Sequence, residues 1–100
     1  MLRDFFLGSI KIHILHHASR GPVYGMWLID ELSRHGYPLS AGTLYPILHA
    51  LENQHLLKSD KQLVKGKIRK YYTISKTGEK ILQEAKLRTK ELMDELYENK

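Results

Sequence analysis

The spacing of apolar and polar residues predicts four helices and one β-hairpin. Four segments carry apolar residues at helical intervals, and two shorter segments alternate loosely and are rich in Leu, Val, Ile and Tyr. The helices are expected at 3–18, 24–35, 40–53 and 76–98, and the strands at 57–64 and 68–74. Three helices followed by a hairpin is the order of a winged helix-turn-helix, and the short connection 35–39 fits that motif. We therefore predict a mainly α fold with a two-stranded hairpin, extended by a long C-terminal helix.

The helix predicted at 40–53 begins with SAGTLYP, which is an unusual start. Ser40 is a favourable N-cap, but Gly42 and Pro46 are unfavourable within a helix. At about 100° per residue, both fall opposite the apolar face. That face consists of Leu44, Ile47, Leu48 and Leu51. In a helix-turn-helix protein the opposite, outward face enters the major groove of DNA, so the two helix breakers lie where a backbone would approach DNA.

Other side chains on the outward face suit contacts with DNA. His49 and Asn53 are the best placed to read base edges. Ser40 and Thr43 can donate hydrogen bonds to phosphates, as can the free N–H groups of the first turn. None of these residues is basic, so the helix brings little charge of its own. The alternative is that Ser40 is only a cap and that Tyr45, beside this face, only packs against the hairpin.

Basic residues are concentrated in the predicted hairpin. The net charge of +5 and the pI of about 9.5 favour an anionic partner. The cations between positions 58 and 70 are Lys58, Lys61, Lys65, Lys67, Arg69 and Lys70, and they face only one acidic residue, Asp60. Beside a helix-turn-helix, such a wing would neutralise phosphates and supply sequence-independent affinity. The alternative is that its lysines only protect an edge strand from aggregation.

The first and last predicted helices carry more apolar surface than one small domain can cover. On the first helix, one apolar face consists of Leu7, Ile10, Ile14 and Ala18, and further apolar residues lie on another face. A helix that is apolar on two sides must bury both. We therefore divide the chain into a DNA-binding domain, 1–75, and a dimerisation helix, 76–100. The residues predicted to form the dimer are Leu2, Phe5, Ile12, Ile81, Ala85, Leu92 and Leu96.

Several classes of protein are disfavoured. The chain has no cysteine, which removes disulfides and thiolate metal sites and fits a reducing compartment. Charged residues and histidines interrupt the N-terminal segment, unlike a signal peptide, and no apolar run approaches the roughly 20 residues that span a membrane. No nucleophile–base pair, phosphate-binding glycine loop or pair of carboxylates stands out. We expect a cytoplasmic protein that is not an enzyme, uses no cofactor and binds no membrane.

Three histidines in the first predicted helix raise the question of a metal site. His13, His16 and His17 have i, i+3 and i+4 spacing, which can bring imidazoles together. No acidic residue or cysteine near them completes an obvious ligand set, so we predict no metal site; a metal-responsive regulator is the alternative.

Met26 and Trp27 on the second helix are expected to pack at the rim of the core or at an interface. The alternative is that they line a pocket for a flat apolar ligand.

Four segments occur in the order and spacing of one known family. They are GPVYG (21–25), LSAGTLYPILHALE (39–52), KIRKYYTIS (67–75) and KTGEKIL (76–82). On these segments, the chain resembles the short PadR-like winged-helix transcriptional regulators. The resemblance implies a dimeric DNA-binding repressor in which the first and last helices build the dimer. By position, the residues at or near DNA would be Tyr24, Ser40, Gly42, Thr43, Tyr45 and Pro46, and those of the wing Lys67, Arg69, Lys70 and Tyr71.

The family pattern is not matched at every position. Ala41 stands where proline is common, and Met26 stands where an aromatic residue is usual. His55 stands where glycine is common, and a left-handed backbone there would strain a histidine. Family members respond to phenolic acids, drugs or other small apolar molecules, although many have no known ligand. We therefore predict a homodimeric repressor of a two-fold symmetric operator, with a small apolar effector as an option; the alternative is a winged-helix protein-interaction module that does not bind DNA.

Overall fold

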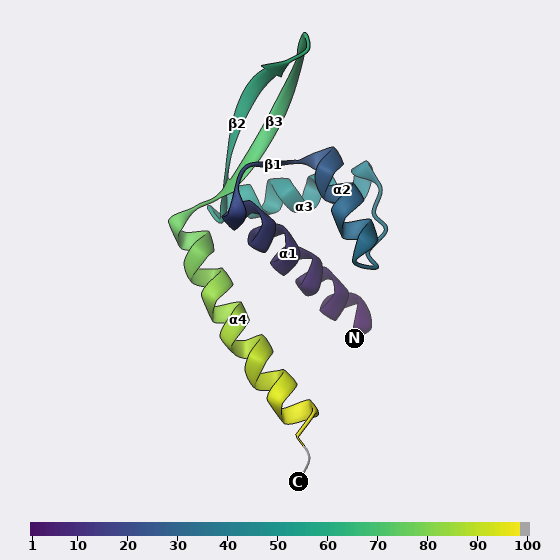
Figure 1. Cartoon of the computed structure of the whole chain (residues 1–100), viewed down its shortest axis with the longest axis vertical. Helices are drawn as coiled ribbons and strands as arrows, with labels where there is room; N and C mark the ends of the chain where they lie inside the picture. The colour runs from purple at the N-terminus through teal and green to yellow at the C-terminus, as the bar shows by residue number, and fades with distance from the viewer. Residues whose placement is uncertain (99–100) are drawn as a thin grey trace.

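The molecule has a packed centre from which two parts project in opposite directions (Figure 1). The computed structural model describes residues 1–98. Its elements are α1 (Leu2–Arg20), β1 (Val23–Tyr24), α2 (Gly25–Arg34), α3 (Ala41–Asn53), β2 (Leu57–Val64), β3 (Lys67–Ile74) and α4 (Lys76–Leu96). The β2–β3 hairpin forms one projection and α4 the other, so the longest dimension is 59 Å. The predicted mainly α fold, in winged helix-turn-helix order with a long last helix, is confirmed.

The sheet has three strands, one more than the sequence predicts. β3 is central, and β1 and β2 pair with it antiparallel. In β1, Val23 pairs with Tyr72 and Tyr24 with Tyr71. The prediction that Tyr24 belongs to the second helix is wrong, because its backbone is extended (φ −127°, ψ 163°) and α2 begins at Gly25. A strand of two residues is too short to show alternation, so the hydrophobic pattern does not reveal it.

Lys65 and Gly66 form the two-residue loop of the hairpin. Val64 pairs with Lys67 across the loop, and the two loop residues have φ angles of 51° and 80°. Positive φ at both positions is the geometry of a type I′ turn, whose twist matches that of paired strands. This turn places Lys65 at the tip of the wing.

The core receives side chains from every helix and strand. The largest fully buried side chains are Ile14, Leu28, Leu32, Leu44, Leu48 and Tyr72. On α3, Leu44, Leu48 and Leu51 are buried as predicted, whereas Ile47 at the edge of that face is only partly buried. Burial of a leucine side chain contributes about 1.5–3 kcal/mol, so the inner face of α3 is firmly held.

The start of α4 is locked to the turn that follows α3. The Ser75 hydroxyl accepts a hydrogen bond from the Gly78 N–H (2.9 Å) and donates one to the His55 carbonyl. A Cβ atom at Gly78 would lie 2.2 Å from the Leu56 carbonyl oxygen, so this approach requires glycine. His55 has φ 62°, so its backbone is left-handed, a conformation that is unfavourable for a histidine.

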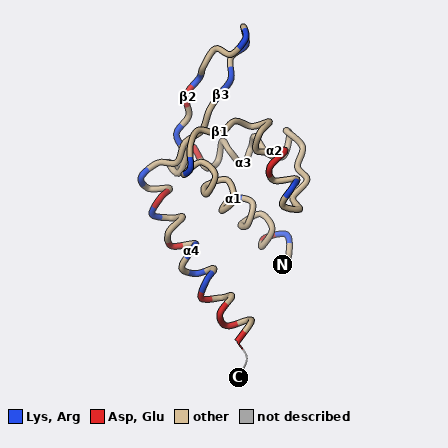
Figure 2. The backbone as a smooth tube through the Cα atoms, in the orientation of Figure 1, with Lys and Arg blue, Asp and Glu red and all other residues tan. Residues whose placement is uncertain are grey.

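Beyond its first two turns, α4 leaves the core. Gly78 and Leu82 are its buried residues, and the helix ends at Leu96 rather than at residue 98 as predicted. Charges of both signs alternate along it, while the hairpin tip carries basic residues (Figure 2). No helix among residues 1–98 is long and apolar enough to cross a membrane.

Candidate nucleic-acid interface

The first turn of α3 is capped by Ser40. The Thr43 N–H donates to the Ser40 hydroxyl oxygen at 3.3 Å, and that hydroxyl donates in turn to the Thr43 hydroxyl at 3.3 Å. Both hydroxyls remain exposed. The outward face is also exposed at Gly42, Pro46, His49 and Asn53. The structure thus brings these predicted residues to one solvent-facing surface, and their contact with DNA stays a prediction.

Tyr45 fixes how α3 meets α2. A Cβ atom at Gly25 would lie 2.2 Å from the Tyr45 hydroxyl oxygen, so the tyrosine ring occupies the space that glycine leaves open. The close neighbour of Gly25 is therefore a side chain and not another backbone segment. Since Gly25 directly follows Tyr24, this contact places the predicted α3 surface next to β1.

A cationic and aromatic cluster forms one face of the wing near its base. The Arg69 guanidinium lies 4.1 Å from the centre of the Tyr24 ring. The Tyr24 and Tyr71 rings meet edge to face, with centres 5.6 Å apart, and Arg69 donates to the Tyr71 hydroxyl at 3.5 Å. The hydrogen bond to Tyr71 raises the pKa of Arg69 above its usual value. Stacking on an aromatic face orders a guanidinium while its remaining N–H groups stay available to an anion.

The wing cations divide between two faces of the hairpin. Side chains alternate along a strand, so Lys67 shares the face of Arg69 and Tyr71, while Lys70 points to the opposite face. There the Lys70 ammonium lies 3.3 Å from a carboxylate oxygen of Glu52 at the end of α3. The Ser59 hydroxyl also donates to Glu52, and these partners, Ser59 first, lower the pKa of that carboxyl. Sequence reasoning grouped Lys70 with the free wing cations and missed this pair.

One open hollow lies between β1, the first residues of α2, Tyr45 of α3 and the wing. Its volume is about 560 Å³. The residues around it include Tyr24, Gly25, Tyr45, Lys65, Lys67, Arg69 and Lys70. The hollow therefore joins the start of the helix-turn-helix unit to the basic hairpin, which is blue at its tip in Figure 2.

Comparison with known proteins agrees with this geometry. A family model described as "Transcriptional regulator PadR-like family" matches residues 14–84. The chain belongs to the PadR-like family of transcriptional regulators. It is 44% identical over 95 residues to the transcriptional regulator Rv3488 of Mycobacterium tuberculosis, covering 95% of this chain and 89% of that protein. The prediction that the chain is not an enzyme is thereby confirmed.

Solved structures of transcriptional regulators share the fold along nearly the whole chain. A PadR family transcriptional regulator from Eggerthella lenta superposes with a TM-score of 0.82 at 34% identity, covering 99% of this chain and 91% of its own. A Streptococcus transcriptional regulator superposes with a TM-score of 0.83 at 25% identity, covering 92% of each chain. The short PadR-like architecture predicted from the sequence is therefore confirmed.

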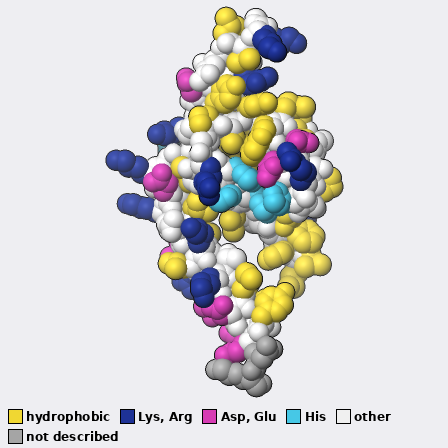
Figure 3. All heavy atoms as spheres, viewed as in Figure 1, with side chains coloured by type: hydrophobic (Ala, Val, Ile, Leu, Met, Phe, Trp, Pro, Cys, Tyr) yellow, Lys and Arg dark blue, Asp and Glu magenta, His cyan; other side chains and the backbone are white. Residues whose placement is uncertain are grey.

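The residues predicted to form a dimer of this PadR-like regulator are mostly exposed. Leu2, Phe5, Ile81, Leu92 and Leu96 are between 46% and 66% exposed. Ile12 and Ala85 are half-buried. In Figure 3, hydrophobic side chains gather on α1 and α4 toward the end of the molecule that carries both termini.

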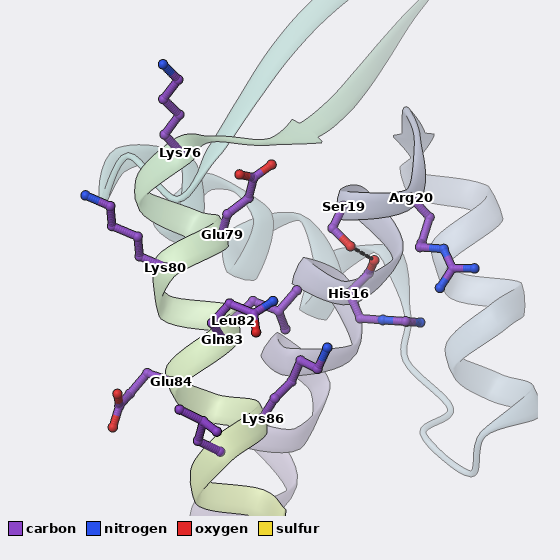
Figure 4. Close-up of a pocket in the computed structure, with 11 residues that line it drawn as sticks. His16, Ser19, Arg20, Lys76, Glu79, Lys80, Leu82, Gln83, Glu84 and Lys86 are labelled. Carbon is purple, nitrogen blue, oxygen red and sulfur yellow. Dashed lines mark hydrogen bonds between the residues drawn. The ribbon is translucent and has the colours of Figure 1, made fainter.

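Two hollows separate α1 from α4. One, with a volume of about 570 Å³, is apolar and is lined by residues that include Phe5, Ile12 and Leu82. The other lies between the last turns of α1 and the first turns of α4 (Figure 4) and has a volume of about 820 Å³. Charged groups of both signs surround it, and Lys80 and Glu84 point away from it in Figure 4. Neither hollow contains a predicted DNA-binding residue.

The histidines of α1 do not form the group that their spacing suggests. His13 and His17 turn toward α2, whereas His16 is exposed. The expectation that no acidic residue lies near them is wrong, because Glu31 of α2 reaches His17. Trp27 is half-buried, with its ring centre 5.3 Å from that of His17, while Met26 is 63% exposed. In the sequence, only the i, i+4 spacing of Glu31 and His35 indicates that an acidic residue and a histidine of this group lie close together.

Proposed function

We propose that this PadR-like regulator is a homodimeric repressor that binds a two-fold symmetric operator through α3 and the wing. The observation that carries the proposal is that the helix-turn-helix unit, through Gly25 and Tyr45, borders the same hollow as the basic hairpin. In such a dimer the two α3 helices would enter successive major grooves about 34–36 Å apart. A repressor of this kind works where the chromosome is, so we place it in the cytoplasm.

The two elements would contribute different contacts. His49 and Asn53 would read base edges, because they are exposed on the outward face of α3. Ser40, Thr43 and the free N–H groups of the first turn would contact phosphates and set the register. Lys65, Lys67 and Arg69 would bind phosphates beside the groove, whereas Lys70 would mainly hold the hairpin to Glu52.

The dimer would be built from α1 and α4, the helices outside the helix-turn-helix unit. The exposed Leu92 and Leu96 lie on the part of α4 that follows its buried residues, Gly78 and Leu82. The apolar hollow at Phe5 and Ile12 lies beside it, on the facing side of α1. A second copy would cover both, since obligate dimer interfaces resemble a protein core cut in half.

We extend the proposal to a small apolar effector. The apolar hollow between α1 and α4 is the better site for it, because Phe5, Ile12 and Leu82 line its wall. The hollow at Trp27, about 490 Å³ in volume, is shared with His17, Arg20 and other polar groups. An effector between α1 and α4 would change the angle at which the dimer presents its two α3 helices.

A salt titration with duplex DNA of mixed sequence tests the DNA-binding part of the proposal. We expect log K to fall linearly with log [salt], by about 0.9 for each neutralised phosphate, hence a slope near −5 for six wing cations in a dimer. No binding at low salt would instead support the protein-interaction module.

Light scattering tests the dimer. Leu92→Glu combined with Leu96→Glu should give a monomer. Gln83→Glu, which adds charge to α4 off the apolar stripe, should leave a dimer.

A further inference from the structure

Three side chains from α1 and α2 bring their potential metal-ligand atoms together where these two helices meet. His17 lies on α1, Glu31 lies on α2, and His35 caps the end of α2. Their imidazole nitrogens and carboxylate oxygen all lie within 4.8 Å of one another. In Figure 3 histidine side chains gather at the centre of the visible face, beside acidic and apolar groups.

The spacing of these atoms fits a single small metal ion. One Glu31 carboxylate oxygen lies 3.5 Å from His17 Nε2 and 3.0 Å from His35 Nε2. Two ligands bound tetrahedrally at zinc distances of about 2.0–2.1 Å are roughly 3.4 Å apart. The observed separations lie on either side of that value, so small side-chain rotations would place one ion within reach of all three ligands.

The three side chains are of the kinds that bind transition-metal ions. His17 and His35 offer imidazole nitrogens, and Glu31 offers a carboxylate oxygen. Transition metals are commonly bound by imidazole and carboxylate together, so this set of ligands suits a divalent cation.

The surroundings of the three ligands are both enclosed and accessible. The side chains of His17 and Glu31 are 17% exposed, while that of His35 is 46% exposed, which leaves an approach from solvent. The His13 ring centre lies 5.0 Å from that of His35, so a third imidazole adjoins the group. The Arg34 guanidinium lies 3.6 Å from the other carboxylate oxygen of Glu31, and it also forms an ion pair with Asp30.

A hydrogen bond between Glu31 and His35 explains only part of this arrangement. Residues four apart on a helix commonly pair in this way, and such a pair needs no further partner. It leaves unexplained why His17, on another helix, places its Nε2 atom 3.5 Å from the same carboxylate oxygen. A shared divalent cation would give all three ligands one common partner.

We propose that His17, Glu31 and His35 bind a divalent transition-metal ion of the Zn²⁺ class, which joins α1 to α2. Two imidazoles and one carboxylate favour Zn²⁺, Ni²⁺ or Cu²⁺ over Mg²⁺ and Ca²⁺, which prefer oxygen ligands. Three protein ligands leave one tetrahedral position for water or for His13. The site lies on α1 and α2 and includes no residue of α3 or the hairpin. It therefore goes beyond the proposed DNA-binding function and can be tested independently of it.

Calorimetric titration of the full chain with Zn²⁺ in the absence of DNA tests the site. We expect one ion per chain for the wild-type protein and no binding of Mg²⁺ under the same conditions. Glu31→Gln removes the negative charge with little change of shape, and His35→Ala removes a ligand at an exposed cap. Each should weaken Zn²⁺ binding by more than about tenfold, because even residues that only support a ligand contribute 10–100-fold.

Two further measurements separate a built site from general histidine binding. His49→Ala removes an exposed histidine on α3 and should leave the affinity for Zn²⁺ unchanged. Trp27 is the single tryptophan and touches His17, so its fluorescence should change on Zn²⁺ addition in wild type and not in Glu31→Gln. Absence of one-to-one binding, or an affinity that Glu31→Gln and His35→Ala leave unchanged, would overturn the proposal.

Discussion

α3 and the hairpin border the same hollow, but they are built in contrasting ways. The outward face of α3 carries no Lys or Arg, and its inner face is anchored by the buried Leu44 and Leu48. The hairpin carries the exposed Lys65 and Lys67 at its tip and the half-buried Arg69, which is ordered by Tyr24 and Tyr71. A rigid neutral helix suits base reading, whereas a projecting charged hairpin suits phosphate binding.

The largest expected effect is a difference in stability between substitutions on the buried face and on the exposed face of α3. Leu48→Ala empties a fully buried site and is expected to reduce the free energy of unfolding by about 2–5 kcal/mol. His49→Ala, at the next position but exposed, should change it by less than about 0.5 kcal/mol. Urea denaturation of both variants measures the difference, and a similar loss in both would show that the α3 faces are assigned wrongly.

The next effect concerns the outward face alone. His49→Ala or Asn53→Ala should weaken binding to the specific operator by about 1–3 kcal/mol, the usual cost of a lost base contact. Affinity for unrelated duplexes should hardly change, because neither side chain supplies charge. The operator is first selected from random duplexes, and affinities for both kinds of DNA are then compared at one salt concentration. Equal losses on both would remove the base-reading role.

Sequence patterns predict the architecture well, and the reasons are local. The order of helices, the hairpin, the Ser40 cap and the glycine turn follow from periodicity and turn chemistry. The outward position of Gly42, Pro46, His49 and Asn53 follows from helical spacing once α3 is recognised. The family resemblance rests on the same segments, and the match to a PadR-like family model confirms it.

Features that depend on tertiary contact were not predictable in the same way. β1 is too short to have a period, and its pairing with β3 is what places Tyr24 beside Arg69. The Lys70–Glu52 pair joins residues on different elements, so counting charges along the chain does not reveal it. Glu31 likewise reaches His17 only because α1 and α2 pack together, and no spacing within α1 reveals that.

The smallest effect should distinguish the two faces of the wing. Lys70→Ala and Arg69→Ala remove the same charge from residues that line the same hollow, but Lys70 is paired with Glu52 whereas Arg69 is stacked on Tyr24. Loss of the Lys70–Glu52 pair should lower stability by less than about 1 kcal/mol. Thermal unfolding measures that change, and titration with mixed duplex DNA should show a clear loss of affinity only for Arg69→Ala. The opposite ranking of the two variants on DNA would mean that the Lys70 face is the one bound.

The most direct test of the contrast between α3 and the wing is the salt dependence of DNA binding by Lys67→Ala/Arg69→Ala. Lys76→Ala/Lys80→Ala, which removes two exposed cations from the start of α4, is the matched control. The wing variant should bind operator and unrelated DNA more weakly by the same factor, and its salt slope should shrink by about 0.9 for each lost phosphate contact. The control should keep the wild-type slope. A wild-type slope in the wing variant, or a loss confined to the operator, would contradict the assignment of phosphate binding to the wing.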